Sequence, residues 1–343
     1  MGKYESLGQY LELHGVNYVK DTHVRELSWI KIGGRIKHAI YPESLDELVS
    51  LIGALREYGI FFRVFGNTSN CMFLNSEKYG VFIFLKKLRG INIDSSTGIV
   101  VAEGGVNLSV LSRKAVALGL KGFEGMVGIP ATVGGAIFMN AGSFDCEIQD
   151  VLESVTYLDL DSLTIKTIAV EALGFSYRSS AFLRKQINGI ILKGTFRCER
   201  ENPEVLKLRM ERAIAQRKEF QEKKTANLGS LFATKDIYGA IAKHHRGYSF
   251  VLHMYRRSCF RLKKHFGIDL SDNKVLNAIT QLYFFKRFEK KVFSDKTLNC
   301  FVNDSNTDED FFELVNWIRG LTNGELPLEN EIVNSLEGDE IND

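Results

Sequence analysis

Between residues 119 and 142 the chain places seven glycines in 24 positions, and this density restricts what the segment can form. Glycine loses much conformational freedom in helices and strands, and it has no side chain with which to pack a core. So many glycines suit a backbone that approaches a ligand closely. We therefore expect the functional site of this 343-residue chain to include this stretch.

The remaining composition is that of a folded globular protein. Hydrophobic residues make up 45% of the chain, charged residues 25%, and proline occupies only 4 positions. Such a chain can bury a large core, which excludes disorder throughout, and at roughly 100 to 200 residues per domain its length predicts two or three domains. The 44 basic and 42 acidic residues nearly cancel, so the chain as a whole is not expected to bind polyanions.

The cysteines and the N-terminal segment indicate where the protein works. The five cysteines lie far apart without a CxxC pair, which predicts free thiols and argues against a disulfide framework or a metal site. The first 15 residues carry acidic side chains and no apolar core, unlike a secretory signal. No apolar run approaches the roughly 18 residues of a membrane helix. We expect a cytoplasmic protein without a transmembrane segment.

Local patterns predict a mixture of helices and strands. Ser44 and Glu47 form a capping box before a helix that ends at Gly59. Short alternating strands between 151 and 198 indicate an antiparallel sheet. Further elements are expected as strands at 60–66, 81–85 and 99–102, and as helices at 107–118, from Pro203 and from Thr307.

Residues 241–291 form a basic segment with twelve Lys or Arg and only three acids. It is interpreted either as a helical insertion with a small aromatic core of its own, or as a basic face. Such a face would bind phosphates, nucleic acid or an acidic membrane, because aromatics interleaved with cations suit all three. The sequence does not separate these alternatives, and no nucleic-acid partner is assigned. The core would consist of Phe250, Tyr255, Phe260, Phe266, Phe284 and Phe285.

Two loops are candidates for holding a ligand. GNTSN at 66–70 follows a predicted strand, and its small residues let successive N–H groups point into one concavity that accepts anions. In the segment 122–142, Pro130 makes a rigid turn, Thr132 can cap a helix, and Gly134 with Gly135 leaves room for a flat or phosphorylated ligand. Neither GxGxxG nor a Walker loop is present, which excludes a Rossmann or P-loop site.

Seven motifs in order resemble those of the UDP-N-acetylenolpyruvoylglucosamine reductase family. The resemblance implies an α+β chain with the vanillyl-alcohol-oxidase-type (PCMH-type) FAD-binding fold. In this family the fold has two subdomains, here 1–78 and 79–200, followed by a substrate-binding domain at 201–335 that holds the basic insertion. The motifs are WIKIGGR (29–35), RVFGNTSN (63–70), GFEGMVGIPATVGGAIFMNAGSF (122–144), GFSYRSSAF (174–182), NLGSLF (227–232), LNCFVN (298–303) and LENE (328–331).

The resemblance also implies a reaction and its residues. In the family, NADPH reduces FAD, and the flavin then reduces UDP-N-acetylglucosamine enolpyruvate to UDP-N-acetylmuramate, a peptidoglycan precursor. By motif, Arg178 corresponds to the arginine at the substrate carboxylate, Ser230 to the proton donor, and Glu331 to the carboxylate that assists in stabilising the enol-like intermediate. The corresponding flavin-binding residues are Gly66, Thr68, Ser69, Asn70, Gly128, Ile129, Thr132, Gly134 and Gly135.

Departures from the family pattern leave alternatives open. The short connection after residue 182 resembles the branch without a substrate-covering tyrosine loop. Ala131 stands where the family has glycine, which would strain the backbone if its φ were positive. The changes cluster in the substrate domain, so the alternatives are a paralogue that reduces another unsaturated nucleotide sugar, or a flavin-binding scaffold whose basic insertion holds a polyanion. The sequence does not specify an oligomer, and a monomer is expected.

Overall fold

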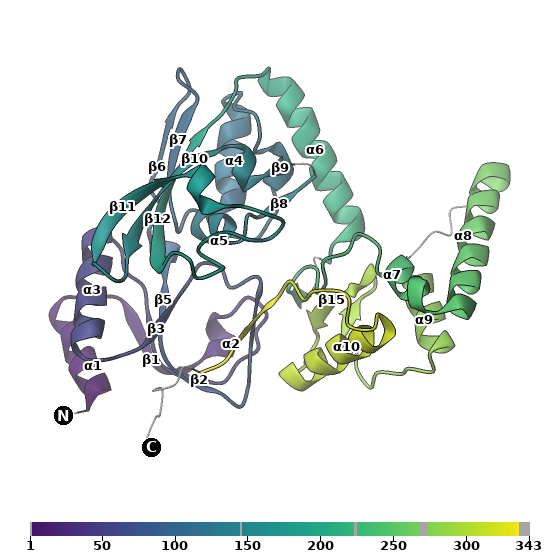
Figure 1. Ribbon diagram of the computed structural model, residues 1–343, viewed down its shortest axis with the longest axis horizontal. Helices are drawn as coiled ribbons and strands as arrows, with labels where there is room; N and C mark the ends of the chain where they lie inside the picture. Colours follow the sequence, from purple (N-terminus) through teal and green to yellow (C-terminus); the bar gives the residue numbers. More distant parts are fainter. Residues whose placement is uncertain (1, 145, 223–224, 268–272, 336–343) are drawn as a thin grey trace.

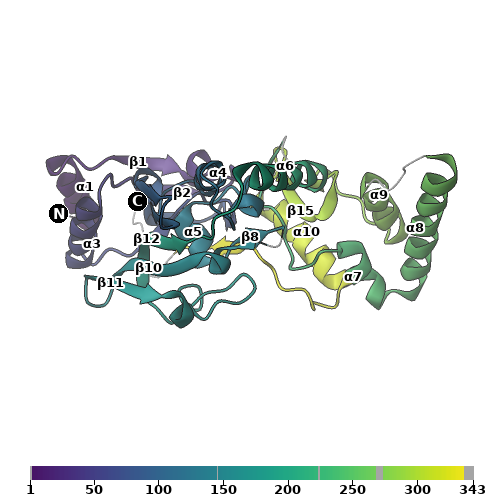
Figure 2. The same cartoon turned by 90° about the horizontal axis from the view of Figure 1, so that it is seen from above.

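The computed structural model of the protein describes residues 2–144, 146–222, 225–267 and 273–335. Figure 1 shows three regions that follow one another along the chain, each with its own sheet. Helix α1 (Lys3–Leu13) lies at one end of the elongated molecule, and helix α8 (Arg246–Phe266) lies at the other, as Figure 2 also shows. The predicted mixture of helices and strands is therefore distributed over three packed units.

The first region is a four-stranded sheet covered on one face by α1 and α3. After α1 it contains β1 (Tyr18–His23), α2 (Val24–Leu27), β2 (Arg35–Ile40), α3 (Leu45–Glu57), β3 (Phe62–Phe65), β4 (Cys71–Phe73) and β5 (Lys78–Phe84). The strand order is β1-β2-β5-β3, with β1 antiparallel to β2 and β5 parallel to both neighbours. The predicted capping box begins α3, where Ser44 Oγ accepts a hydrogen bond from the Glu47 N–H at 3.1 Å.

The second region is a five-stranded antiparallel sheet with strand order β11-β10-β12-β7-β6. Helices α4 and α5 share its buried core, which confirms the predicted helix at 107–118 and the antiparallel sheet at 151–198. Its elements are η1 (Leu85–Lys87), β6 (Ile91–Asp94), β7 (Ile99–Glu103), α4 (Leu108–Ala117), η2 (Glu124–Met126), α5 (Val133–Phe138), β8 (Gly142–Ser143), β9 (Cys146–Glu147), η3 (Ile148–Asp150), β10 (Leu152–Asp159), β11 (Thr164–Ala169), η4 (Val170–Leu173) and β12 (Gly189–Arg197).

The sheets suggest a different boundary between these regions from the one expected at 78/79. Strand β5 runs from Lys78 to Phe84 and pairs along its length with β2 and β3 of the first sheet. Cutting the chain after residue 78 would remove a central strand from that sheet. We propose that the first subdomain continues to Phe84.

The third region is helical around a three-stranded sheet with strand order β13-β15-β14. Its last long helix, α10, begins with the predicted capping box of Thr307 and Asp310 and buries Phe311, Leu314, Val315 and Ile318. The region contains α6 (Pro203–Phe220), β13 (Ala226–Asn227), α7 (Ile237–His244), α8, α9 (Asn273–Tyr283), β14 (Phe293–Ser294), β15 (Thr297–Asn303), α10 (Asp308–Leu321) and β16 (Glu331–Val333).

The basic segment is helical, but its expected aromatic core is wrong. Phe250 and Phe260 are each 67% exposed, and Phe285 is 95% exposed. Helix α8 instead buries Tyr248 and Leu252, which join the core that α10 and β15 share. The error lies in the helical phase, because the buried stripe and the phenylalanines occupy different sides of the same helix. Of the six predicted core aromatics, Tyr255 and Phe284 pack partly against this larger core, and Phe266 is exposed.

The C-terminal strand returns to the first region. Strand β16 pairs in parallel with β4, with Glu331 opposite Cys71. In Figure 1 this yellow segment crosses from the third region back toward β2 and α2. Within the described ranges, no helix has both the length and the apolar character needed to span a bilayer.

Candidate active site

One cavity of about 1340 Å³ lies where the three regions meet, and all twelve predicted site residues line it. Its volume exceeds the roughly 300–1,000 Å³ of common small-ligand sites, so it has room for more than one small ligand. The lining includes the expected reacting residues Arg178, Ser230 and Glu331. It also includes the nine expected flavin contacts Gly66, Thr68, Ser69, Asn70, Gly128, Ile129, Thr132, Gly134 and Gly135.

The loop after β3 has the geometry of an anion-binding turn. Thr68 adopts a φ of 56°, which is unusual for a β-branched residue, and its Oγ1 accepts a hydrogen bond from the Trp29 N–H at 2.8 Å. The same hydroxyl donates to the Asn67 carbonyl at 2.7 Å. Within the described residues, the N–H groups of Thr68 and Ser69 have no acceptor. They are free to donate to an anionic ligand.

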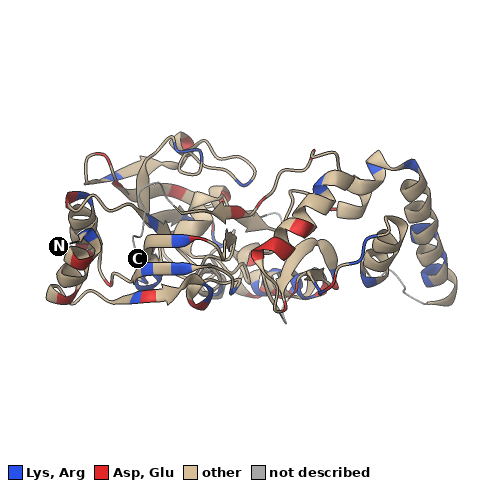
Figure 3. Cartoon of the chain, turned by 90° about the horizontal axis from the view of Figure 1, so that it is seen from below, with Lys and Arg blue, Asp and Glu red and all other residues tan. Residues whose placement is uncertain are grey.

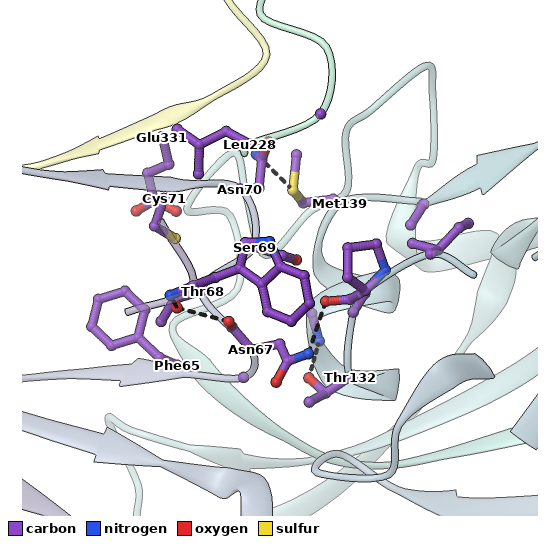
Figure 4. A pocket seen from close by; sticks show the side chains of 18 of the residues that line it. Phe65, Asn67, Thr68, Ser69, Asn70, Cys71, Thr132, Met139, Leu228 and Glu331 are labelled. Carbon is purple, nitrogen blue, oxygen red and sulfur yellow. Dashed lines mark hydrogen bonds between the residues drawn. The ribbon is translucent and has the colours of Figure 1, made fainter. Parts of the chain in front are cut away.

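The second glycine-rich loop is tied directly to the first. Asn67 Nδ2 donates to the Pro130 carbonyl at 3.0 Å, so the two predicted ligand loops contact one another where they line the cavity (Figure 4). Thr132 Oγ1 accepts from the Gly135 N–H at 3.3 Å and caps α5, as expected from its sequence. Ala131 does not have a positive φ, so its departure from the family glycine causes no backbone strain of that kind.

The glycines of these loops serve different purposes. A Cβ at Gly66 would collide with Thr132 Oγ1, and a Cβ at Gly134 would press on the Gly104 carbonyl oxygen at 3.1 Å. Both positions are therefore bare because two protein segments meet there. A Cβ at Gly135 would lie 3.4 Å from Thr132 Oγ1, which is an ordinary contact. Packing against the protein therefore does not explain the missing side chain at Gly135.

Arg178 lies at the tip of a tight turn. Ser176 and Ser179 exchange two backbone hydrogen bonds, and Arg178 between them adopts a φ of 52°. Its guanidinium donates to the Gly142 carbonyl at 3.0 Å, which directs the side chain into the cavity wall. The neighbouring Tyr177 hydroxyl donates to Glu329 at 2.7 Å. This contact joins the arginine turn to the segment that carries Glu331.

Glu331 is positioned by strand pairing and by Asn70. The Asn70 Nδ2 donates to the Glu329 carbonyl at 2.8 Å, and its Oδ1 accepts from Asn330 at 2.9 Å. Glu331 as a whole residue is exposed in the cavity, but protein surrounds its carboxyl group. This burial raises the pKa of Glu331, while the nearby cations Arg63 and Lys185 partly oppose the shift. Figure 4 shows Glu331 beside Cys71 at the edge of the site.

Ser230 follows a left-handed glycine. Gly229 has a φ of 71° and donates its N–H to Asn227 Oδ1 at 3.1 Å, which fixes the turn before the serine. The next residue, Leu231, accepts from the Glu329 N–H at 2.7 Å. The serine and glutamate motifs are thereby held side by side. The Ser230 hydroxyl has no hydrogen-bond partner in the described part of the chain and remains available to a ligand.

Sequence reasoning missed Arg217, a buried arginine on α6 that also lines the cavity. Its Nη2 donates to Ser143 Oγ at 2.5 Å, while its buried Nε has no acceptor among the described residues. Burial and the nearby Arg178 cation lower the pKa of Arg217 to about 10. An anion between the two guanidinium groups would relieve this repulsion. The signal was present, because residue 217 continues the inward spacing of Leu206 and Ala213.

The cavity as a whole is positively charged. Six Lys or Arg and three Glu line it, and the cations missed from the sequence include Arg63 and Lys185 as well as Arg217. This balance favours anionic ligands such as pyrophosphates and carboxylates. Within the described ranges, no group of three or more His, Cys, Asp and Glu is placed to hold a metal ion. The site is suited to organic anions.

Comparisons with known proteins agree with this geometry. A family model described as an FAD binding domain matches residues 36–167. The UDP-N-acetylenolpyruvoylglucosamine reductase of Caldicellulosiruptor saccharolyticus is 38% identical over 55% of this chain and 59% of its own length. The protein of the same name from Caldanaerobacter subterraneus subsp. tengcongensis is 36% identical over 66% of this chain and 73% of that relative. The chain belongs to the UDP-N-acetylenolpyruvoylglucosamine reductase family.

A solved structure supports the assignment at the level of the fold. The crystal structure of UDP-N-acetylenolpyruvylglucosamine reductase from Thermus caldophilus has a TM-score of 0.65 at 24% identity. The likeness covers 92% of this chain and 98% of that chain. Together with the FAD-domain match, it confirms the predicted FAD-binding fold. The first relative above is matched over less than two thirds of its length.

The residues present fit an FAD. The unpaired N–H groups of Thr68 and Ser69 suit its pyrophosphate, and the bare position at Gly135 leaves room for a flat or phosphorylated group. The loops that would hold it are tied together through Asn67 and therefore need little rearrangement. A preorganised site of this kind loses little entropy when the cofactor binds.

Proposed function

We propose that the protein is an FAD-dependent reductase that converts UDP-N-acetylglucosamine enolpyruvate to UDP-N-acetylmuramate with NADPH, in peptidoglycan precursor synthesis. The observation that carries this proposal is that Arg178, Ser230 and Glu331, from three distant segments, line the same cavity as the flavin loops. A chain relieved of catalysis has no reason to keep these three groups together. This argues against a scaffold that only holds flavin.

The reaction needs a hydride, a proton and a binding site for a carboxylate. Bound FAD supplies the hydride, which it takes from NADPH and gives to the vinyl methylene carbon of the substrate. Negative charge then develops on the neighbouring carbon and its carboxylate. The planar guanidinium of Arg178 can bind both carboxylate oxygens, and Arg217 adds a second cation to the same cavity. These two residues orient the substrate and stabilise the developing charge.

Ser230 gives its hydroxyl proton to the carbon next to the one that receives the hydride. Serine is a weak acid, so the step depends on geometry, and a fixed turn with an otherwise unengaged hydroxyl supports this role. Glu331, whose pKa is raised by desolvation, lies in the same cavity and assists in stabilising the enol-like intermediate. The two groups are held side by side through Leu231 and Glu329.

The family substrate is favoured over another nucleotide sugar by the position of the insertion. None of the described residues of the basic segment 241–291 lines the cavity. The part of the chain that departs most from the family pattern therefore leaves the proposed substrate contacts unaltered. None of the five cysteines, all of which the structure describes, is in a disulfide, which supports the proposed cytoplasmic location.

Anaerobic mixing of the purified protein with NADPH, and then with UDP-N-acetylglucosamine enolpyruvate, tests the proposal. We expect NADPH to bleach the flavin absorbance and the second substrate to restore it. Bleaching without recovery would replace the substrate assignment with the paralogue. A protein that binds FAD but is not bleached by NADPH would favour the scaffold.

A further inference from the structure

The outer face of helix α8 is exposed along the whole helix. Tyr248, Leu252 and Cys259 form its buried side. Residues spaced by three or four positions lie above one another on a helix, so Phe250, Met254, Arg257, Arg261 and Lys264 form a stripe on the opposite side. We call these five residues, with the flanking Arg246 and Phe260, the α8 outer face.

The apolar members of the α8 outer face are large and uncovered. Phe250 and Phe260 are each 67% exposed, and Met254 is 46% exposed. Single exposed apolar residues are common on protein surfaces, but several on one helix mark a surface that another body covers. The spacing of these three residues places them within two and a half to three turns of the helix.

The polar members of the α8 outer face are all basic. Helix α8 contains six Lys or Arg and no Asp or Glu, and in Figure 3 it is marked blue and not red. Arg256 pairs with Asp236 at 2.9 Å at the side of the helix. Among the described residues, Arg257, Arg261 and Lys264 have no carboxylate partner. Their charges are available to an external anion.

We infer that the α8 outer face docks on an anionic lipid bilayer. The phenylalanines and Met254 enter the boundary between headgroups and acyl chains, while the arginines and the lysine remain at the level of the lipid phosphates. Charge complementarity supplies the attraction, because a surface rich in acidic lipid favours each nearby Lys or Arg by about 1 kcal/mol. This binding is peripheral and independent of the proposed reaction.

The shape of the surface favours a bilayer over other anionic partners. Helix α8 has 21 residues, or about 30 Å of length, and projects at the end of the molecule opposite α1 (Figure 2). Single-stranded nucleic acid binds in grooves that follow its backbone, whereas a long convex helix matches a plane. A second copy of the chain would present the same cations to this face and be repelled.

Docking at α8 leaves the proposed catalytic cavity unaltered. No residue of α8 lines that cavity, so the lipid interaction can be removed by substitution without changing a residue assigned to substrate or flavin. The variants F250S/F260S and R257E/R261E remove the apolar and the charged part of the face separately. Their matched controls are Phe61→Ser, at another exposed phenylalanine, and R113E/R212E, at two exposed arginines outside the face.

The test is co-sedimentation of the full chain with vesicles of phosphatidylcholine alone or mixed with phosphatidylglycerol. We expect binding to the mixed vesicles only, and its loss when salt screens the charges. R257E/R261E should weaken partitioning by about tenfold or more, since each basic residue is worth about 1 kcal/mol at such a surface. F250S/F260S should also weaken it by about tenfold or more, because the two rings no longer enter the apolar boundary. The two controls should bind like the unmodified protein. Circular dichroism and the unfolding midpoint of each variant establish that it is folded.

Three results would overturn the inference. The first is no binding to the mixed vesicles, or equal binding to phosphatidylcholine alone. The second is tight binding of a single-stranded RNA oligonucleotide that F250S/F260S abolishes, with no vesicle binding. The third is a dimer in sedimentation velocity that the same variant dissociates, again without vesicle binding.

Discussion

The predicted flavin loops and the proposed reacting residues line the same cavity, but the structure secures them differently. The loops at 66–70 and 128–135 belong to the first and second regions, each of which has a hydrogen-bonded sheet of its own. A hydrogen bond from Asn67 to Pro130 ties the two loops together. Ser230 and Glu331 lie on a turn and a three-residue strand, and contacts between regions hold them in place. Asn70 is the main link, because its side chain forms hydrogen bonds with Glu329 and Asn330, which lie 259 and 260 positions later in the sequence.

This contrast implies that flavin binding and substrate reduction can be disrupted separately. The cofactor site is built from elements whose main contacts are within the first two regions, so it should tolerate changes in the third. The proposed second half-reaction uses groups from three distant segments at once. A substitution at one of these two sites should therefore change flavin binding and substrate reduction to different extents.

Ser230→Ala should have the largest effect. It should leave reduction of the flavin by NADPH unchanged and slow reoxidation by the enolpyruvyl substrate by about 10² to 10⁴-fold, because it removes the proposed proton donor. Stopped-flow absorbance at the flavin band measures both halves. Ser258→Ala, at an exposed serine on α8, is the matched control. If both half-reactions slow equally in Ser230→Ala, the serine is not the proton donor.

Arg217→Met should reduce ligand binding more than chemistry. Removing a buried charged hydrogen-bond partner costs about 1.5 to 3 kcal/mol, so the KM for the anionic substrate should rise about 10 to 150-fold with a smaller change in kcat. Arg212→Met, exposed on the same helix, is the control. An unchanged KM in a folded Arg217→Met protein would show that this arginine serves only its protein partners Gly125, Ser143 and Gln221, and not the substrate.

Gly66→Ala and Gly135→Ala form a matched pair that separates packing from ligand approach. The new methyl at residue 66 collides with Thr132 Oγ1, and such overpacking costs about 1 to 3 kcal/mol. We expect a lower unfolding midpoint and weaker flavin retention. At residue 135 the methyl has ordinary contacts in a helix, so stability should be maintained while FAD affinity falls. Unchanged FAD affinity in Gly135→Ala would refute our interpretation of that glycine.

Glu331 should give the smallest effect, visible in the pH dependence. Burial raises the pKa of its carboxyl, so the neutral form persists to higher pH than in a solvated glutamate. Its contribution to stability is present at pH below the unfolded-state pKa and is lost as pH rises through the folded-state pKa. The reoxidation rate should fall over the same rise. Glu331→Gln keeps a hydrogen-bond donor and should flatten the profile, whereas Glu219→Gln should not.

Much of the fold follows from local sequence signals. Ser44 and Thr307 begin helices where their capping boxes predict, and the glycine-rich loop lines the cavity as its composition suggests. These signals depend on neighbours within one or two turns of the chain. The order of the motifs then identifies the family. Long-range pairing is different, because nothing near Lys78 indicates that β5 lies between β2 and β3 in the first sheet.

The missed features have two physical origins. The phenylalanines of α8 were assigned to a core by composition, although the spacing of Tyr248, Leu252 and Cys259 already defined a different buried side. Arg217 was missed because arginines are mostly exposed, and its buried position depends on contacts with Gly125 and Ser143 from another region. In both cases the burial of the side chain depends on which side of its helix packs against the rest of the protein.

The pairing of β16 with β4 sets the order in which the protein can become active during translation. Glu331 leaves the ribosome after almost every other described residue, at a rate of about 5 to 20 residues per second. The yellow prosthetic group can find its loops on a nascent chain seconds before the last carboxylate arrives. A stalled or clipped product without β16 would thus be coloured yet lack the Glu331 side chain and the β16–β4 pairing at the cavity, so colour alone is a poor assay of completed synthesis.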